Sequence, residues 1–463
     1  MFLALYVEEV DIMERKNHDM EDDGESSESL KYSPLFHVRT TLKVLRTLSG
    51  FPILPANSKW DNFVFIPSKE YPRLFIILIL FSLPINTLLY FFYDNLNALT
   101  LMLNVSKLDY FVEICCLFFL PFCFNGIYFI SFKNNTSLLN SICEEISNIN
   151  YRQDHYHGSL KIHSRAKEKV EQYILLFMMM GVLIAALFGI SGFIAFEFDD
   201  GEMVPNKYKA LLAATLPIIM LLGPISHIVS SGDFIIIYLI LHLTQNLVCL
   251  RTRIEDRKME KKRKTISTTG EVGNLHRRRE TNRKEQDENA EIHDELSTMV
   301  DIALDIGNAI EKVNNCFSSM LFCYFGGNLL IATSSFYLAV NYLFISPYSA
   351  LDLGWGLWST VCFILYMGRL YLLTTSGHEL GQEMMYLKQT MMSFVSVDNH
   401  DVKLKQCETN NFSGKFDLMI SILDNNAPIS PYGYFSVNGG SFLSASATIV
   451  TYLIVLIQFK ISE

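Results

Sequence analysis

Hydroxyl and amide side chains recur along one face of the last apolar segment, where they could contact water, ions or another helix. Residues 441–459 form 19 positions without a charge, which is about the length needed to cross a bilayer. The face consists of Ser444, Thr448, Thr451, Val455 and Gln458. Steps of four, three, four and three residues bring these positions onto one side of a helix.

Two interpretations of this polar face follow from its place in an apolar segment. Hydrocarbon offers polar groups no hydrogen-bond partner, so the face should meet a sister helix or water. Small hydroxyl side chains favour close helix packing. A pore lining is the alternative, and it requires several chains around one axis. In that case Val455, between Thr451 and Gln458, forms part of a narrow apolar constriction that gates by dewetting.

A second group of candidates lies at the ends of two other apolar segments, residues 316–344 and 354–373. Its members are polar or aromatic: Ser335, Tyr337, Asn341, Tyr342, Asp352, Trp355, Trp358 and Ser359. Trp355 and Trp358 are three residues apart and share a helix face. They fit either the aromatic belt of a membrane interface or the walls of a small-molecule pocket. Glu113 lies inside another apolar segment, residues 110–132. It fits either a ligand contact or a carboxylate that snorkels to the interface.

Signals for catalysis are weak. His378 and Glu379 begin like a zinc-protease helix, but position 382 is Gln where a second His ligand is needed. The sequence contains no phosphate-binding loop and no metal-spaced Cys/His cluster. We therefore expect a protein that is not an enzyme and that uses neither a metal nor a cofactor.

Composition predicts an all-α membrane protein. Half of the 463 residues are apolar and only 19% are charged. Seven segments are long and apolar enough to span: Leu74–Tyr93, Tyr110–Phe132, Tyr173–Phe196, Ala210–Leu250, Cys316–Phe344, Gly354–Leu373 and Ser441–Phe459. The fourth has 41 residues, and we interpret it as one long helix that projects beyond the bilayer.

Basic residues predict the orientation. With a cytoplasmic N-terminus, the inner segments contain 33 Lys and Arg and the outer segments contain four. Seven spans then leave the C-terminus extracellular, which is the inverse of G-protein-coupled receptors. Asn104 begins an outer glycosylation triplet, Asn104-Val105-Ser106. Asp233 and Arg369 lie within spans, and for both we favour a structural ion pair or hydrogen bond.

The chain divides into four parts by composition. Residues 1–35 form an acidic tail that we expect to be disordered on the cytoplasmic side. Residues 36–373 form a ligand-binding helical domain with a basic cytoplasmic insert at 251–298. Residues 374–440 form a cytoplasmic anchor, and 441–463 form the last helix with a short tail. The insert could bind anionic lipid or a protein partner. We favour the alternative, a solvated segment that enforces the topology. Nucleic-acid binding is not expected.

The C-terminal residues resemble the signature of insect gustatory receptors. Thr451-Tyr452, five apolar residues and Gln458-Phe459 carry the resemblance, and residues 432–438 (Tyr-Gly-Tyr-Phe-Ser-Val-Asn) resemble the family's run into the last span. The seven-span layout, inner N-terminus and long fourth helix also fit. Many sugar receptors have Glu where this chain has Leu453, so members that sense fructose or bitter plant compounds remain open.

The resemblance implies a function. Gustatory receptors, like the related odorant receptors, are ligand-gated cation channels built as tetramers, whose last helices line a central pore. It implies that Gln458 and Phe459 lie at the outer constriction with Val455 one turn below, and that an outward pocket includes Trp355 and Trp358. The expected partners are a small tastant, membrane lipids and identical or related subunits in the plasma membrane of gustatory receptor neurons. The alternative is a receptor without a pore that signals through a cytoplasmic partner.

Overall fold

The computed structural model describes residues 33–35, 42, 53–55, 63–65, 135–157, 233–268, 278–345, 350–398, 409–424 and 428–462. Its helices are α8 (Thr136–His157), α11 (Asp233–Thr268), α12 (Arg278–Val340), α13 (Ala350–Asp398), α14 (Thr409–Leu423) and α15 (Gly439–Ser462). A π-helical turn, η4 (Asn341–Ile345), follows α12, and a 3₁₀ turn, η5 (Pro431–Gly433), precedes α15. Strands β1 (Ile53–Pro55) and β2 (Phe63–Phe65) pair antiparallel, with Leu54 opposite Val64.

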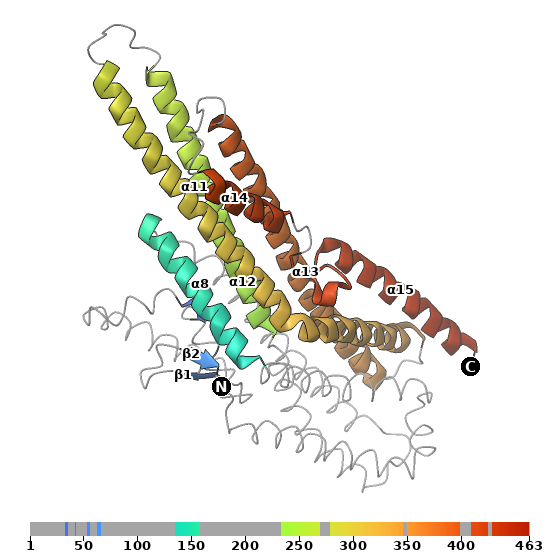
Figure 1. Cartoon of the computed structure of the whole chain (residues 1–463). Helices are drawn as coiled ribbons and strands as arrows, with labels where there is room; N and C mark the ends of the chain where they lie inside the picture. The colour runs from blue at the N-terminus through green and yellow to red at the C-terminus, as the bar shows by residue number, and fades with distance from the viewer. Residues whose placement is uncertain are drawn as a thin grey trace, which may run out of the picture.

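The long helices α11, α12 and α13 pack against one another and carry most of the buried core (Figure 1). Helix α8 covers α12 and α11, α14 crosses α12 and α13, and α15 lies along the outside of the array (Figure 1). Among the described residues, three helical stretches are long and apolar enough to span a membrane: Phe234–Glu260, Asp294–Ile345 and Gly439–Lys460. These stretches overlap the predicted fourth, fifth and seventh spans.

The predicted sixth span lies inside α13, but it is not one of these three stretches. The side chains of Trp355 and Trp358, near its start, lie outside what the structure describes. The first three predicted spans, Glu113, Asn104 and most of residues 1–35 lie outside the described residues, as does the first part of the fourth span. The count of seven spans and the orientation therefore stay predictions.

Helices α11 and α12 continue well past their apolar stretches into the basic segment 251–298. Helix α11 runs on to Thr268, and α12 begins at Arg278, so helix occupies most of this insert. Arg253 and Arg257 of α11 both form ion pairs with Glu295 of α12, the second at 3.0 Å. The carboxylate of Glu295, one-sixth exposed, thus links two guanidinium groups and fixes the pairing of the two helices.

A buried polar layer joins α8 to α11. The amide of Asn150 lies 3.0 Å from Nε2 of His242, and Asn246 Nδ2 donates to Asn150 Oδ1 at 3.1 Å. The Gln153 amide donates to the Asn246 carbonyl at 3.1 Å. Such partners must be matched in position, since an unmade buried hydrogen bond is costly, so the layer fixes the register of α8 on α11.

Ion pairs around the layer tie α8 to α12. Arg152 pairs with Asp305, and Lys312 donates to Glu145 at 2.7 Å. The five described cysteines are free, and burial raises the pKa of the Cys143 thiol to about 12, with the nearby Cys316 sulfur adding to the shift. A half-buried thiol at Cys143 that stays neutral is chemically inert at neutral pH.

Arg369 is buried within the protein, against aromatic rings. Its guanidinium lies 5.3 Å from the ring centre of Tyr324 on α12 and 5.9 Å from that of Tyr366 on α13. Both contacts are cation–π interactions, which are strongest when the pair is shielded from water. They support the structural role predicted for Arg369. Asp233 is the first described residue of α11, so its place in a longer helix stays a prediction.

We predict that Glu295→Gln destabilises the pairing of α11 with α12. The change removes the charge that Arg253 and Arg257 share, and it should lower the free energy of unfolding by about 1–3 kcal/mol. Scanning fluorimetry of the receptor in detergent should show this loss of stability as a lower apparent melting temperature. The control is Glu260→Gln, because Glu260 pairs with Arg257 at a site where both side chains are nearly half exposed, and it should change stability by less than about 0.5 kcal/mol. Equal shifts for the two variants would contradict the prediction.

Candidate functional site: the last helix and the ends of α12 and α13

Helix α15 begins at a reciprocal cap. Ser441 N–H donates to Asn438 Oδ1 at 3.1 Å, and Asn438 N–H donates to Ser441 Oγ at 3.1 Å. Each side chain thereby satisfies a backbone donor that the first turn leaves unpaired. The run after Ser441 is apolar and lacks Pro, so the helix continues to Ser462. The structure thus begins the last helix two residues before the predicted span.

Only one narrow face of α15 is buried within the chain. Ala445, Ile449 and Leu453 recur every four residues and pack inward. In the most apolar part of Gly439–Lys460, 17% of residues are buried, against 78% for the corresponding part of Phe234–Glu260. Because α15 is the more apolar of the two stretches, lipid or other chains must cover most of its surface.

The predicted stripe lies outside this packed face. Ser444, Thr451, Val455 and Gln458 are exposed, Thr448 is half-buried, and the neighbouring Phe459 is exposed as well. Most of the stripe is therefore accessible, so packing against the described helices of its own chain does not account for it. Packing against a second chain and lining of a pore both remain compatible with this exposure.

Two threonines of the stripe direct oxygen lone pairs outward. Thr448 Oγ1 donates to the Ser444 carbonyl at 2.8 Å, and Thr451 Oγ1 donates to the Ala447 carbonyl at 2.9 Å. Each hydroxyl has one hydrogen, and the helix backbone takes it. The outward side of each oxygen is then an acceptor, which suits water hydrogens or a cation.

The polar residues predicted near the pocket on α12 are buried rather than open to solvent. Ser335, Tyr337 and Asn341 are each at most 3% exposed. Tyr337 belongs to a small cluster with Leu338, Tyr342 and Leu453 of α15, so it packs against the last helix. Tyr337 therefore joins α12 to α15, a contact that sequence periodicity alone did not indicate.

Asn341 has unmet hydrogen bonds. It lies in the π-helical turn η4, and neither its side-chain Nδ2 nor its Oδ1 has a hydrogen-bond partner among the described residues. Ser359 Oγ on α13, also buried, is in the same condition. Interruptions of this kind in α-helices frequently mark functional sites. The π turn places an amide in the core without a hydrogen-bond partner among the described residues, and the sequence pattern did not signal the π turn.

Asp352, Trp355 and Trp358 fall in the first three turns of α13, and their side chains lie outside what the structure describes. The neighbouring backbone is close-packed, because a Cβ on Gly356 would lie 2.7 Å from the Leu343 side chain and 3.3 Å from Tyr342 Cβ. Glycine at 356 thus lets α13 approach η4, which places the start of α13 beside Tyr342, the residue after Asn341.

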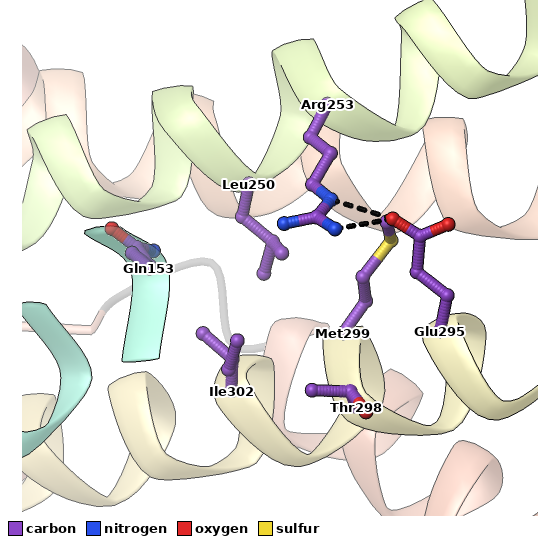
Figure 2. A pocket seen from close by; sticks show the side chains of 7 residues that line it. All are labelled: Gln153, Leu250, Arg253, Glu295, Thr298, Met299 and Ile302. Atoms are coloured by element: carbon purple, nitrogen blue, oxygen red, sulfur yellow. Dashed lines mark hydrogen bonds and ion pairs between the residues drawn. The ribbon is translucent and has the colours of Figure 1, made fainter. Parts of the chain in front are cut away.

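A small cavity is found elsewhere, between α8, α11 and α12. It is lined by Gln153, Leu250, Arg253, Glu295, Thr298, Met299 and Ile302. Figure 2 shows Arg253 and Glu295 meeting at its edge. Its volume of about 10 Å³ suits one water molecule rather than a ligand. His378, considered above for a metal site, instead lies 3.0 Å from the Gln382 amide.

Comparisons with known proteins decide the family. Residues 38–463 match the family model of the 7tm Chemosensory receptor. The chain belongs to this chemosensory receptor family. The receptor is also similar in fold to the insect olfactory receptor OR5 from Machilis hrabei in complex with eugenol, with a TM-score of 0.57 and 15% identity over 91% of this chain and 99% of that one.

A second structure of OR5 from Machilis hrabei gives a TM-score of 0.52 at 13% identity, with the same coverage. No curated protein sequence matches the receptor. The family and the spanning stretches together indicate a multi-pass membrane protein. The predicted resemblance to insect chemoreceptors is thereby confirmed.

We predict that Asn341→Leu stabilises the ligand-free receptor. Leucine has a similar volume and leaves no buried polar atom unpaired, so the free energy of unfolding should rise by about 1–3 kcal/mol. Thermal unfolding in detergent measures the change. Thr333→Val is the matched control on α12, because Thr333 Oγ1 already donates to the Leu329 carbonyl at 2.7 Å and its loss should bring no gain. A melting temperature for Asn341→Leu at or below the wild-type value would contradict the prediction.

Proposed function

We propose that the receptor is a tastant-gated, non-selective cation channel of chemosensory neurons, built as a tetramer of identical or related subunits. The observation that carries the proposal is the exposed stripe of α15 in a helix that the chain leaves mostly uncovered. One helix cannot enclose a pore, so several copies of α15 around an axis would cover its surface and face the stripe inward. The resemblance of residues 451–459 to gustatory receptors, which are tetrameric channels, supports the same assembly.

The chemistry of the stripe supports passage of cations. The outward oxygens of Thr448 and Thr451 act as acceptors, and acceptors replace part of the hydration of a cation. Gln458 and Phe459, both exposed, would form the outer constriction, with Val455 one turn below. Apolar side chains at a narrow point exclude water until the helices separate, and this provides a closed state.

The ligand pocket is proposed at the ends of α12 and α13. The group comprises Ser335, Tyr337, Asn341, Asp352, Trp355 and Trp358, with Glu113 from the second predicted span. Among the described residues, the Asn341 amide NH₂ and its Oδ1 have no partner, and neither has the Ser359 hydroxyl. A ligand with hydroxyl groups on a ring could form hydrogen bonds with both Asn341 and Ser359. Fructose has such groups, as does a phenolic or other bitter plant compound.

The test of the function is recording from outside-out patches of cells that express this chain alone, without GTP. D-fructose, caffeine and eugenol are applied to the outer face, the last because OR5 was solved with it. A rapid current supports the channel. Silence with confirmed surface protein, followed by a response that requires cytosolic GTP, would favour the receptor without a pore.

We predict that Gln458→Ala changes single-channel conductance or agonist-free current without loss of surface protein. The change widens the proposed constriction and removes an amide from it. Val450→Ala is the control, because Val450 is similarly exposed on α15 but lies off the stripe. Currents of Gln458→Ala that equal those of the wild type would remove the stripe from the pore.

We predict that Trp358→Ala raises the ligand concentration for half-maximal current and leaves ion selectivity unchanged. Loss of one stacked ring should weaken binding by about 0.5–1.5 kcal/mol, or roughly two- to tenfold. Dose–response curves and reversal potentials measure the two effects. Leu357→Ala, at the exposed neighbouring position, is the control. A shifted reversal potential in Trp358→Ala would contradict the pocket assignment.

A further inference from the structure

The segment that leads into α15 is fastened to two long helices at once. It runs from Ile429 to Asn438 and holds its own shape by backbone hydrogen bonds. Val437 N–H donates to the Ile429 carbonyl at 2.9 Å, and Tyr434 N–H donates to the Pro431 carbonyl at 3.0 Å. Ile429 and Val437 are buried, while Tyr432, with a φ of 52°, is exposed. We call this segment the entry loop.

Helix α12 binds the entry loop through Asn314. Its Oδ1 accepts a hydrogen bond from Ser430 N–H at 2.9 Å. One turn further along α12, Ser318 Oγ donates to the Asn314 carbonyl at 2.6 Å, so its lone pair faces Tyr432 N–H at 3.5 Å. Phe325 of α12 packs on Phe435 with ring centres 4.7 Å apart. The backbone of the loop is thus held by side chains of α12.

Helix α13 approaches the other side of the entry loop at Gly377. A Cβ at this position would overlap the Val437 carbonyl oxygen and would lie 3.2 Å from Val437 Cγ1. No side chain fits there unless the backbone moves, because the nearest obstacle is backbone rather than a flexible side chain. The contact therefore sets the separation between α13 and the residue just before the cap of α15.

Both helices connect this loop to the proposed ligand residues. Asn341 follows Asn314 on α12 and η4 by 27 residues, and Trp358 precedes Gly377 on α13 by 19. At about 1.5 Å per residue these separations are roughly 40 Å and 30 Å. Packed helices transmit a tilt or shift over such lengths as nearly rigid bodies. A relative shift of α12 and α13 at the ligand end must then be accommodated at the entry loop, which they both hold.

We propose that Asn314 and Gly377 are positioning residues, which set the position of the first turn of α15 and couple movements of α12 and α13 to it. The role in gating rests on the proposed channel function, whereas the role in placing α15 does not. Neither residue lies on the stripe or near the proposed pocket. Their substitution should therefore change how readily the channel opens, without changing the open pore.

The experiment compares full-length variants that differ in one contact. Gly377→Ala inserts a methyl group against Val437, and Gly368→Ala on the same helix is its control, since a Cβ there meets nothing within 4 Å. Asn314→Leu removes the oxygen that accepts from Ser430 N–H, whereas Asn314→Asp keeps an acceptor oxygen at this place. Asn315→Leu, at the exposed neighbouring position, is the second control.

Agonist-free current and the responses to D-fructose, caffeine and eugenol are recorded in outside-out patches. Gly377→Ala and Asn314→Leu should change the agonist-free current or the half-maximal concentration by roughly two- to thirtyfold at unchanged single-channel conductance. Gly368→Ala, Asn315→Leu and Asn314→Asp should match the wild type. The coupling is overturned if Gly377→Ala and Gly368→Ala give the same agonist-free current and the same half-maximal concentration. A changed single-channel conductance overturns it as well. In both cases the channel function stands.

A silent wild type would count against the channel function, so a second measurement does not depend on current. Hydrogen exchange of the purified receptor is followed in peptides that cover residues 429–445. Gly377→Ala and Asn314→Leu should exchange several-fold faster there than the wild type, with Gly368→Ala and Asn314→Asp unchanged. Equal exchange in all variants overturns the positioning role, whatever the currents show.

Discussion

Helix α15 is the most apolar of the described spanning stretches and the least covered by its own chain. A helix in a bilayer satisfies its backbone internally, but polar side chains on its surface need partners that lipid does not supply. Ala445, Ile449 and Leu453 use the one face that α12 and α13 offer. Every other feature of the receptor's last segment follows from the need to cover what remains. Lipid suits the apolar positions, and the stripe requires either water or another chain.

The opposite condition holds in the bundle formed by α8, α11 and the early part of α12. There the Glu295 carboxylate joins two arginines, and the Asn150 and His242 side chains meet within a buried layer. Groups with partners fixed in this way have one low-energy arrangement. Even in this layer, Gln153 Oε1 and Asn246 Oδ1 have no partner among the described residues. At Asn341, neither side-chain polar atom has a described partner, and the same holds for Ser359 Oγ. The two regions thus differ in degree, since the layer is partly paired through Asn150, Gln153 and Asn246.

Sequence periodicity was sufficient to predict α15 as a spanning helix, because a charge-free stretch of this length with one polar face fits few other structures. Its start was placed two residues late, since the cap between Asn438 and Ser441 depends on side chains that precede the apolar run. The extent of α11 and α12 was underestimated, because their charged continuations are stable only through each other, as Arg253 and Glu295 illustrate. A pairing between residues 42 apart leaves no local pattern.

In the candidate site, too, local features could be predicted from the sequence and tertiary contacts could not. That Ser444, Thr451 and Gln458 share one face could be predicted, as it follows from helix geometry alone, whereas their exposure was left open between packing and a pore. The burial of Tyr337 against Leu453 could not, because it depends on which helix α12 meets. The π turn at Asn341 and the close approach at Gly377 are tertiary features as well. Glycine at 377 gave no signal of its own among the 24 glycines of the chain.

The unpaired groups at Asn341 bear on why a channel of this kind would need several subunits. A ligand shifts a two-state equilibrium only by its difference in affinity for the two states. A shift from 1:99 to 99:1 requires about 5.5 kcal/mol. A ligand that satisfies Asn341 in one state recovers about 1–3 kcal/mol there. One such site is too weak to open a pore decisively, whereas four sites that act on one ring of α15 helices supply about 4–12 kcal/mol from the same interaction. In the proposed tetramer, an ordinary hydrogen-bond energy would thus become a switch.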